Sequence, residues 1–187
     1  MVEVILLAAG QSKRFGKNKL LHKLENGKEI VCQCITNINQ AGFNPKVIVQ
    51  ENDTRLINVL RSEKCIVSEC KDSQLGMAHT LAFAIRHYSN ASAWLICLAD
   101  MPYILPDTIK KLHDSLQNTE SLCAPIYQDS RGHPVGFGRK YYEELANLEG
   151  DNGAKSLLHK YQNNLINLEV SDPGVLRDID YPKDLII

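Results

Sequence analysis

The sequence predicts an α/β fold in which helices cover both faces of a mainly parallel β-sheet. Short apolar runs rich in β-branched residues alternate with segments whose apolar residues recur at the helical period. This alternation is typical of parallel sheets, whose strands are joined by crossover helices. Two runs, residues 4–7 and 95–98, are apolar throughout, as in strands that are buried on both faces. We therefore expect these two strands to be central.

The individual elements follow from the same patterns. Strands are expected at residues 2–7, 46–49, 65–68, 94–98, 122–126, 134–137 and 165–170. Helices are expected at residues 30–38, 77–88, 106–116 and 141–148. Gly42 and Gly150 end the first and last of these helices, and Pro106 starts the third.

Length and charge limit the function classes. The chain has 187 residues, no repeat and no Pro/Gly/Ser-rich linker, so a single domain over residues 1–187 is expected. The net charge of −1 and the 6% aromatic content argue against nucleic-acid binding. No apolar run approaches the roughly 20 residues that span a membrane. The N-terminus lacks the basic region of a signal peptide, so a cytoplasmic protein is expected.

Cysteine spacing indicates no metal or redox site. Disulfides are possible for an even number of cysteines, but a chain of this size without a secretory signal favours buried free thiols. No two of the six are separated by two residues, as in a zinc knuckle. They are Cys32, Cys34, Cys65, Cys70, Cys97 and Cys123.

A small-residue turn and a basic loop follow the first predicted strand. Residues 8–10 read Ala-Ala-Gly, and positions 11–24 hold five Lys or Arg residues and no acidic one. Small residues let the backbone approach a ligand, turn amides bind anions, and Arg14 and Lys19 add charge. A polyphosphate cradle is one interpretation, and an ordinary turn with a solvated basic loop is the other. The sequence contains neither GxxxxGK[ST] nor GxGxxG after a strand, so the common phosphate motifs are not supported.

Carboxylates mark the ends of two other segments. Asp100 follows the second central strand and is a candidate Mg²⁺ ligand, the alternative being a cap for the helix that starts near Pro106. Asp178 and Asp180 are spaced to point to one side of an extended segment. One of them is a candidate second ligand, although acidic surface residues before a short terminal helix have the same spacing.

Six segments along the chain are distinctive as a set: LAAGQSKRFGKNKLL, DSQLGMAHTL, LADMPY, RGHPVGFG, GDNGAKSLL and DPGVLRDIDYPKDL. Together they resemble the molybdenum cofactor cytidylyltransferase family over essentially the whole chain. The first is shared with other nucleotidyltransferases, and the set is more specific. The resemblance implies a three-layer, Rossmann-like nucleotidyltransferase fold in one domain.

The implied reaction is transfer of a cytidylyl group from CTP to the phosphate of Mo-molybdopterin, with Mg²⁺ as the cofactor. By the family pattern Arg14, Lys19 and Asp100 are catalytic, and Asp100 and Asp180 bind the metal. The nucleotide contacts implied in this way are Ala8, Ala9, Gly10, Ser12, Arg14, Lys19, Gly76, Met77 and Thr80. The acceptor contacts are Arg131, His133, Pro134 and Lys155. A transient complex with a molybdenum hydroxylase is implied by the family alone.

Plainer interpretations accompany these assignments. Met77 also fits a core position in the first turn of a helix, and Asp151 fits a helix cap as well as a substrate contact. Lys155 stands where the family more often has Arg, and Lys cannot form a bidentate clamp. Ala9 and Asn18 fit the cytidylyl pattern better than the guanylyl pattern.

Three alternatives to the implied reaction stay open. The protein could transfer a nucleotide to a sugar phosphate or to methylerythritol phosphate. It could use GTP with the same pterin. It could also be a carrier of the molybdenum cofactor without catalytic activity.

Overall fold

The computed structural model describes residues 1–10, 15, 18–150 and 153–185. Its centre is an eight-stranded sheet in the order β3-β2-β1-β4-β7-β5-β6, and β8 also pairs with β5, in parallel. The strands are β1 (Val2–Ala8), β2 (Lys46–Gln50), β3 (Ile66–Cys70), β4 (Ala93–Leu98), β5 (Leu122–Tyr127), β6 (Ser130–Arg131), β7 (Val135–Gly138) and β8 (Ile166–Glu169). Only β6 and β7 run against the others. The predicted α/β class with a mainly parallel mixed sheet is confirmed.

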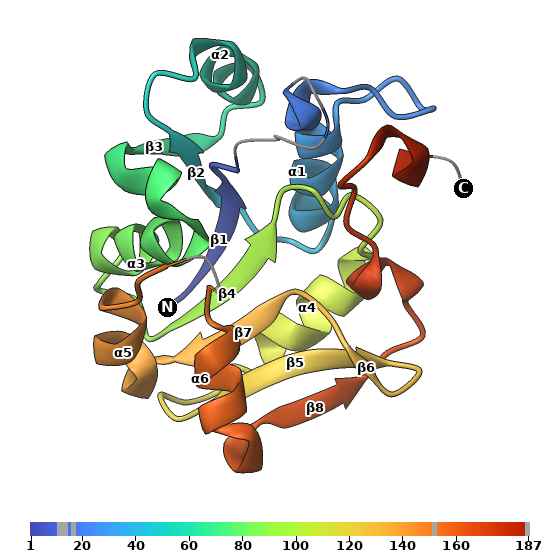
Figure 1. Cartoon of the computed structure of the whole chain (residues 1–187). Helices are drawn as coiled ribbons and strands as arrows, with labels where there is room; N and C mark the ends of the chain where they lie inside the picture. Colours follow the sequence, from blue (N-terminus) through green and yellow to red (C-terminus); the bar gives the residue numbers. More distant parts are fainter. Residues whose placement is uncertain (11–14, 16–17, 151–152, 186–187) are drawn as a thin grey trace.

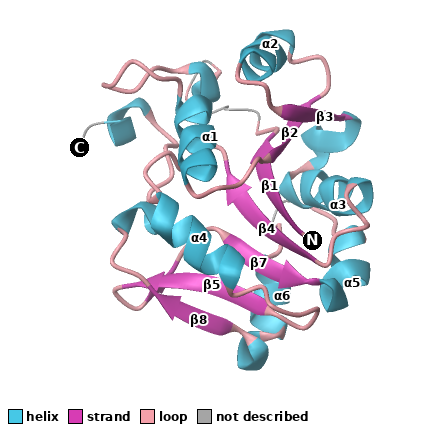
Figure 2. Cartoon of the chain, turned by 180° about the vertical axis from the view of Figure 1, so that it is seen from behind, coloured by secondary structure: helices cyan, strands magenta, loops and turns pink. Residues whose placement is uncertain are grey.

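Helices cover both faces of this sheet (Figures 1 and 2). Helices α1, α2 and α4 pack on one face, and α3, α5 and α6 pack on the other. Their bounds are α1 (Ile30–Gln40), α2 (Thr54–Ser62), α3 (Met77–His87), α4 (Pro106–Asp114), α5 (Tyr142–Ala146) and α6 (Lys155–Lys160). Short 3₁₀ helices complete the chain: η1 (Lys19–Leu21), η2 (Lys71–Leu75), η3 (Arg139–Tyr141), η4 (Gln162–Asn164), η5 (Pro173–Leu176) and η6 (Pro182–Leu185). In the described part of the chain, no helix is both long and apolar enough to cross a membrane.

The two central strands have the predicted burial. Along β1, the side chains of Leu6 and Ile5 point to opposite faces and are both fully buried. In β4, Leu95 and Trp94 alternate in the same way. A strand between two helical layers has no solvent face, which explains the uninterrupted apolar runs. All six cysteines are free thiols, and all except the half-buried Cys65 are buried.

Trp94 anchors the core layer between the sheet and α3. Its side chain is fully buried, and its indole Nε1 donates a hydrogen bond to the carbonyl of Tyr88 at 3.1 Å. We expect Trp94→Ala to lower the free energy of unfolding by about 3–5 kcal/mol, because it leaves a large cavity. Urea unfolding followed by circular dichroism measures this change. The control is Ile166→Ala on β8, where the side chain is 47% exposed and we expect a change of about 0.5 kcal/mol. Equal effects of the two variants would contradict this account of the core.

Candidate functional site

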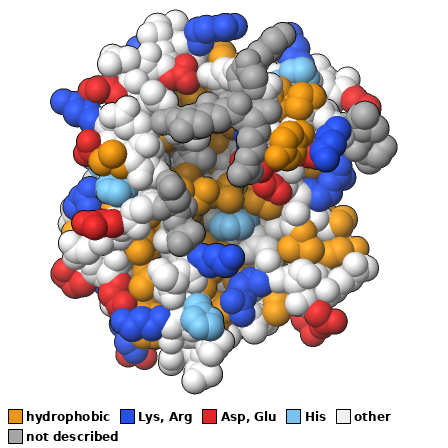
Figure 3. Space-filling view, in the orientation of Figure 1, with side chains coloured by type: hydrophobic (Ala, Val, Ile, Leu, Met, Phe, Trp, Pro, Cys, Tyr) orange, Lys and Arg blue, Asp and Glu red, His pale blue; other side chains and the backbone are white. Residues whose placement is uncertain are grey.

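Parallel pairing brings the ends of β1 and β4 to one edge of the sheet. Leu7 lies opposite Leu98, and the amide of Ala99 donates to the carbonyl of Leu7 at 3.1 Å. The segments that continue from these strands, toward Gly10 and Asp100, therefore start side by side. Open α/β sheets bind ligands beyond the carboxyl ends of their strands. The surface is hollowed near the centre of the face in Figure 3, with histidine, acidic and hydrophobic atoms within the hollow.

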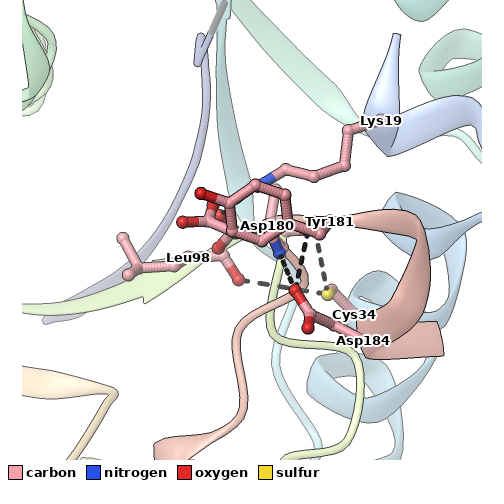
Figure 4. Close-up of polar contacts among 8 residues, drawn as sticks. Lys19, Cys34, Leu98, Asp180, Tyr181 and Asp184 are labelled. Atoms are coloured by element: carbon pink, nitrogen blue, oxygen red, sulfur yellow. Dashed lines mark hydrogen bonds and ion pairs between the residues drawn. The ribbon is translucent and has the colours of Figure 1, made fainter. Parts of the chain in front are cut away.

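Lys19, Asp100 and Asp180 form a cluster of opposite charges at this edge. Lys19 and Asp180 are labelled in Figure 4. The Nζ of Lys19 donates to Oδ2 of Asp100 at 2.9 Å and to Oδ1 of Asp180 at 3.2 Å. Lys19 is only 8% exposed. Burial lowers the pKa of its amine, but the two carboxylates outweigh this effect and hold the pKa above its ordinary value. The cluster thus contains a charged lysine between two carboxylates from distant parts of the chain.

The structure distinguishes the roles of the three candidate carboxylates. Asp180, and not Asp178, is paired with Lys19. Desolvation, together with the negative charges of Asp100 and Asp180, raises the pKa of Asp178, and the positive charge of Lys19 partly opposes this shift. Asp178 therefore lies within the field of the same site. Asp100 is not the cap of α4, because Leu105 occupies the N-cap position and α4 has no side-chain cap.

Asp184 fixes the backbone that carries Asp180. Its Oδ2 accepts hydrogen bonds from the amide of Asp180 at 3.0 Å and from the amide of Tyr181 at 2.7 Å (Figure 4). These contacts hold the start of η6, so the predicted short terminal helix and the site carboxylate occur together. The plain interpretation of this segment as acidic surface residues is incomplete, because Asp180 is an ion-pair partner of Lys19.

His133 lies beside the charge cluster, on the loop between β6 and β7. Its Nδ1 is buried and has no hydrogen-bond partner among the described residues. Burial lowers the pKa of His133, and the nearby charge of Asp100 partly opposes this shift. The amide of His133 donates to the carbonyl of Val175 at 3.0 Å, and Pro134 follows it as a buried residue. Close to Asp100 the imidazole therefore has a buried nitrogen without a partner in the described part of the chain, and its lowered pKa favours the uncharged form at neutral pH.

The first turn of α3 meets the segment before α6. The amide of Ala78 donates to the carbonyl of Gly150 at 3.1 Å, and Gly153 lies against the sulfur of Met77. Met77 is 46% exposed, so the alternative that placed it in the core is wrong. Gly76 caps the helix with a φ of 121°, a backbone conformation that favours glycine.

The other residues predicted to contact the nucleotide or the acceptor have the following places in the structure. Ala8 and Ala9 are buried, and a Cβ on Gly10 would meet no atom of the described residues within 4 Å. The Thr80 hydroxyl is buried and donates to the carbonyl of Gly76 at 3.4 Å. Arg131 and Lys155 are exposed on the surface. Three further residues lie outside the described part of the chain: Ser12, Arg14 and Asp151.

The two carboxylates fit a Mg²⁺ ion that is bound jointly by the protein and a nucleotide. Carboxylate oxygens are ligands that Mg²⁺ prefers, and the ion is often held by one or two carboxylates, several waters and substrate phosphates. Asp100 and Asp180 provide such a pair. Among the described residues, no group of three or more His, Cys, Asp or Glu side chains is arranged to hold a metal by itself. The pair therefore fits an ion that a nucleotide helps to bind.

Three buried residues that were not predicted as part of the site hold the segment that contains Asp100 and the loop after it. Cys34 on α1 donates through its thiol to the carbonyl of Ala99 at 3.3 Å. The side-chain Nδ2 of Asn37, also on α1, donates to the carbonyls of Pro102 and Ile104 at 2.8 and 2.9 Å. Asp172 accepts from the amide of Leu105 at 2.8 Å. In the sequence, the one sign of such a role is Asn37 itself, a polar residue among the apolar residues on the buried side of α1.

Known proteins are similar to this chain in sequence, and solved structures are similar to it in fold. Purine catabolism protein PucB of Bacillus subtilis is 25% identical over 96% of this chain and 92% of its own. A probable molybdenum cofactor guanylyltransferase of Thermococcus sibiricus is 24% identical over 70% of this chain, which spans 65% of that protein. The crystal structure of Rv0371C from Mycobacterium tuberculosis in complex with manganese is 25% identical, with a TM-score of 0.81 over 98% of this chain and 95% of that one. The profile of the MobA-like NTP transferase domain matches residues 4–165, and the chain belongs to this family of nucleotidyltransferases.

Proposed function

We propose that the protein transfers a cytidylyl group from CTP to the phosphate of Mo-molybdopterin. The products are pyrophosphate and molybdopterin cytosine dinucleotide. The observation that carries this proposal is the buried Lys19 between Asp100 and Asp180, at the edge where β1 and β4 end. Family membership supports the nucleotidyl transfer. The choice of CTP and of the pterin depends on the sequence resemblance, including Ala9 and Asn18.

The chemistry needs charge and placement more than a proton acceptor. The nucleophile is a phosphate monoester with a second pKa of about 6, so it is largely ionised at neutral pH. Catalysis then consists of aligning two anions at the α-phosphorus and stabilising the leaving pyrophosphate. Lys19 and Arg14 would hold the triphosphate, and Gly10 would let its backbone amide approach.

Asp100 and Asp180 would hold Mg²⁺. When bound, the ion supplies positive charge that neutralises the phosphates of the nucleotide. The manganese complex of Rv0371C supports a divalent metal in proteins of this shape. Asp184 contributes by fixing the amides at the start of η6, and hence the direction of Asp180.

The proposed acceptor side contains the loop that carries His133. An imidazole whose buried Nδ1 has no partner within the described residues suits a hydrogen bond to a heterocycle or to a phosphate oxygen. Arg131, Pro134 and Lys155 would complete this side, and Gly76, Met77 and Thr80 would face the ribose or base. Delivery of the product to a molybdenum hydroxylase is part of the same proposal.

Pyrophosphate release with the purified protein tests the reaction. The assay contains Mg²⁺ and Mo-molybdopterin and compares CTP, GTP, ATP and UTP, with product identification by mass. Sugar phosphates and methylerythritol phosphate serve as control acceptors. We expect release only with CTP and the pterin. Pyrophosphate release only with a control acceptor would contradict the assignment of the pterin as acceptor. No release with any combination of nucleotide and acceptor would favour a carrier without catalytic activity.

Guanylyl transfer to the same pterin is the second candidate. It is favoured by the similarity to the probable molybdenum cofactor guanylyltransferase of Thermococcus sibiricus. Competition between CTP and GTP in the pterin assay separates the two reactions. A preference for GTP would replace the cytidylyl assignment and leave the proposed roles of Lys19 and Asp100 unchanged.

A further inference from the structure

We propose that Asp172 is a positioning residue that sets the separation of the Asp100 and Asp180 carboxylates, an inference that rests on the proposed function of this pair. Asp172 is 2% exposed, and among the described residues it is the only acidic side chain that is buried. It lies eight residues before Asp180, at the entrance to η5. A buried carboxyl group is costly unless its oxygens accept hydrogen bonds. The hydrogen-bond donors to Asp172 therefore identify the segments that this side chain connects.

Both oxygens of Asp172 accept hydrogen bonds from the backbone. Oδ2 accepts from the amide of Leu105 at 2.8 Å, and Oδ1 accepts from the amide of Gly174 at 2.9 Å. Leu105 belongs to the loop that follows Asp100, whereas Gly174 belongs to the segment that leads to Asp180. One side chain thus connects the two segments that carry the site carboxylates.

Further contacts keep these two segments side by side. A Cβ on Gly174 would lie 2.2 Å from the carbonyl oxygen of Tyr103, so only glycine fits this crossing. The guanidinium of Arg177 lies 4.4 Å from the ring centroid of Tyr103. The amide of Ile179, adjacent to Asp180, donates to the carbonyl of Asp100 at 2.9 Å. This hydrogen bond therefore joins the backbone of Asp100 to the residue just before Asp180.

The loop after Asp100 is also held from the opposite side, by α1. Asn37 binds the carbonyls of Pro102 and Ile104, and its own Oδ1 accepts from Gln33 at 2.7 Å. Asn37 thus ties this loop to the helical layer, and Asp172 ties the segment that leads to Asp180 to the same loop. Residues that orient metal ligands typically change metal affinity or activity by about 10- to 100-fold when they are replaced.

The test uses Asp172→Asn, which preserves the shape of the side chain but replaces one acceptor oxygen with an amide group. We expect faster hydrogen exchange at the amides of Leu105, Ile179 and Asp180, and no change at the β1 and β4 amides. We also expect the Mg²⁺ concentration for half-maximal pyrophosphate release to rise about tenfold, with a smaller change in kcat at saturating Mg²⁺. Exchange is measured on the full chain without nucleotide, so it reports on Asp172 even if the proposed reaction fails.

Two further variants separate positioning from stability. Ser121→Ala removes the buried hydroxyl hydrogen-bonded to Asn118 in the loop before β5, and it should leave both the Mg²⁺ requirement and the Ile179 exchange unchanged. In the double variant Asp172→Asn with Asp180→Asn, the effects on the Mg²⁺ requirement should be less than additive. Unchanged exchange at Ile179, an unchanged Mg²⁺ requirement or full additivity would each overturn the proposal.

Discussion

Replacing Asp100 with Asn is expected to lower kcat/KM for pyrophosphate release by about 10²-fold or more, the scale found when one electrostatic stabiliser is removed. The substitution preserves the shape of the side chain and removes its negative charge. Asp100 accepts from Lys19 at 2.9 Å, and its side chain is still 26% exposed. It can therefore interact with a metal or a substrate as well as with the lysine.

Metal binding checks this explanation without the reaction. Asp100→Asn should weaken Mn²⁺ binding, measured as an increase in the free-ion electron paramagnetic resonance signal in the presence of CTP. Asp107→Asn is a matched control, because Asp107 is an exposed acidic residue in the first turn of α4. Undiminished turnover of the Asp100 variant, or equal losses in both variants, would contradict the assigned role.

The prediction of the central sheet from the sequence succeeded for a physical reason. Strands buried on both faces need apolar side chains at every position, so the runs that became β1 and β4 were distinctive. Their pairing then determined where the residues after each strand would meet. That Lys19 and Asp100 meet where β1 and β4 end was therefore predictable.

Elements without a distinctive pattern were missed. Helix α2 has only three buried residues, Leu56, Ile57 and Leu60, although Asp53 caps it through the amide of Leu56 at 3.1 Å. Strand β6 is two residues long. It follows a turn in which Gln128 and Asp129 adopt φ values of 46° and 62°. The usual glycine signal for such a turn is absent, because other residues adopt the left-handed conformation here.

The supporting residues of the site could not be predicted from local patterns. Asn37 binds the carbonyl of Pro102, which is 65 residues away in sequence, and Asp172 binds the amide of Leu105 across 67 residues. Such contacts depend on how the completed layers meet. Backbone carbonyls and amides also carry no residue identity, so no sequence motif records the partner. The charged atoms of the site were therefore easier to identify than the groups that hold them in position.

Lys19→Met is expected to lower turnover by about 10²-fold or more, because the substitution removes the positive charge proposed to hold the triphosphate. Its effect on Mn²⁺ binding in the absence of nucleotide should be opposite to that of Asp100→Asn. The Nζ of Lys19 lies within 3.2 Å of both carboxylates, where it competes electrostatically with a divalent cation. Removing the ammonium group takes away the positive charge that lies between Asp100 and Asp180, so Mn²⁺ should bind more tightly.

The matched control is Lys23→Met, which replaces an exposed lysine four residues further along the chain. It should alter neither turnover nor Mn²⁺ binding. A Lys19 variant with normal turnover would remove the lysine from the proposed mechanism. Weaker Mn²⁺ binding in that variant would instead show that Lys19 helps to build the metal site. The expected combination, lower turnover with tighter metal binding, requires the lysine to leave the carboxylate pair for the triphosphate when metal and nucleotide bind together.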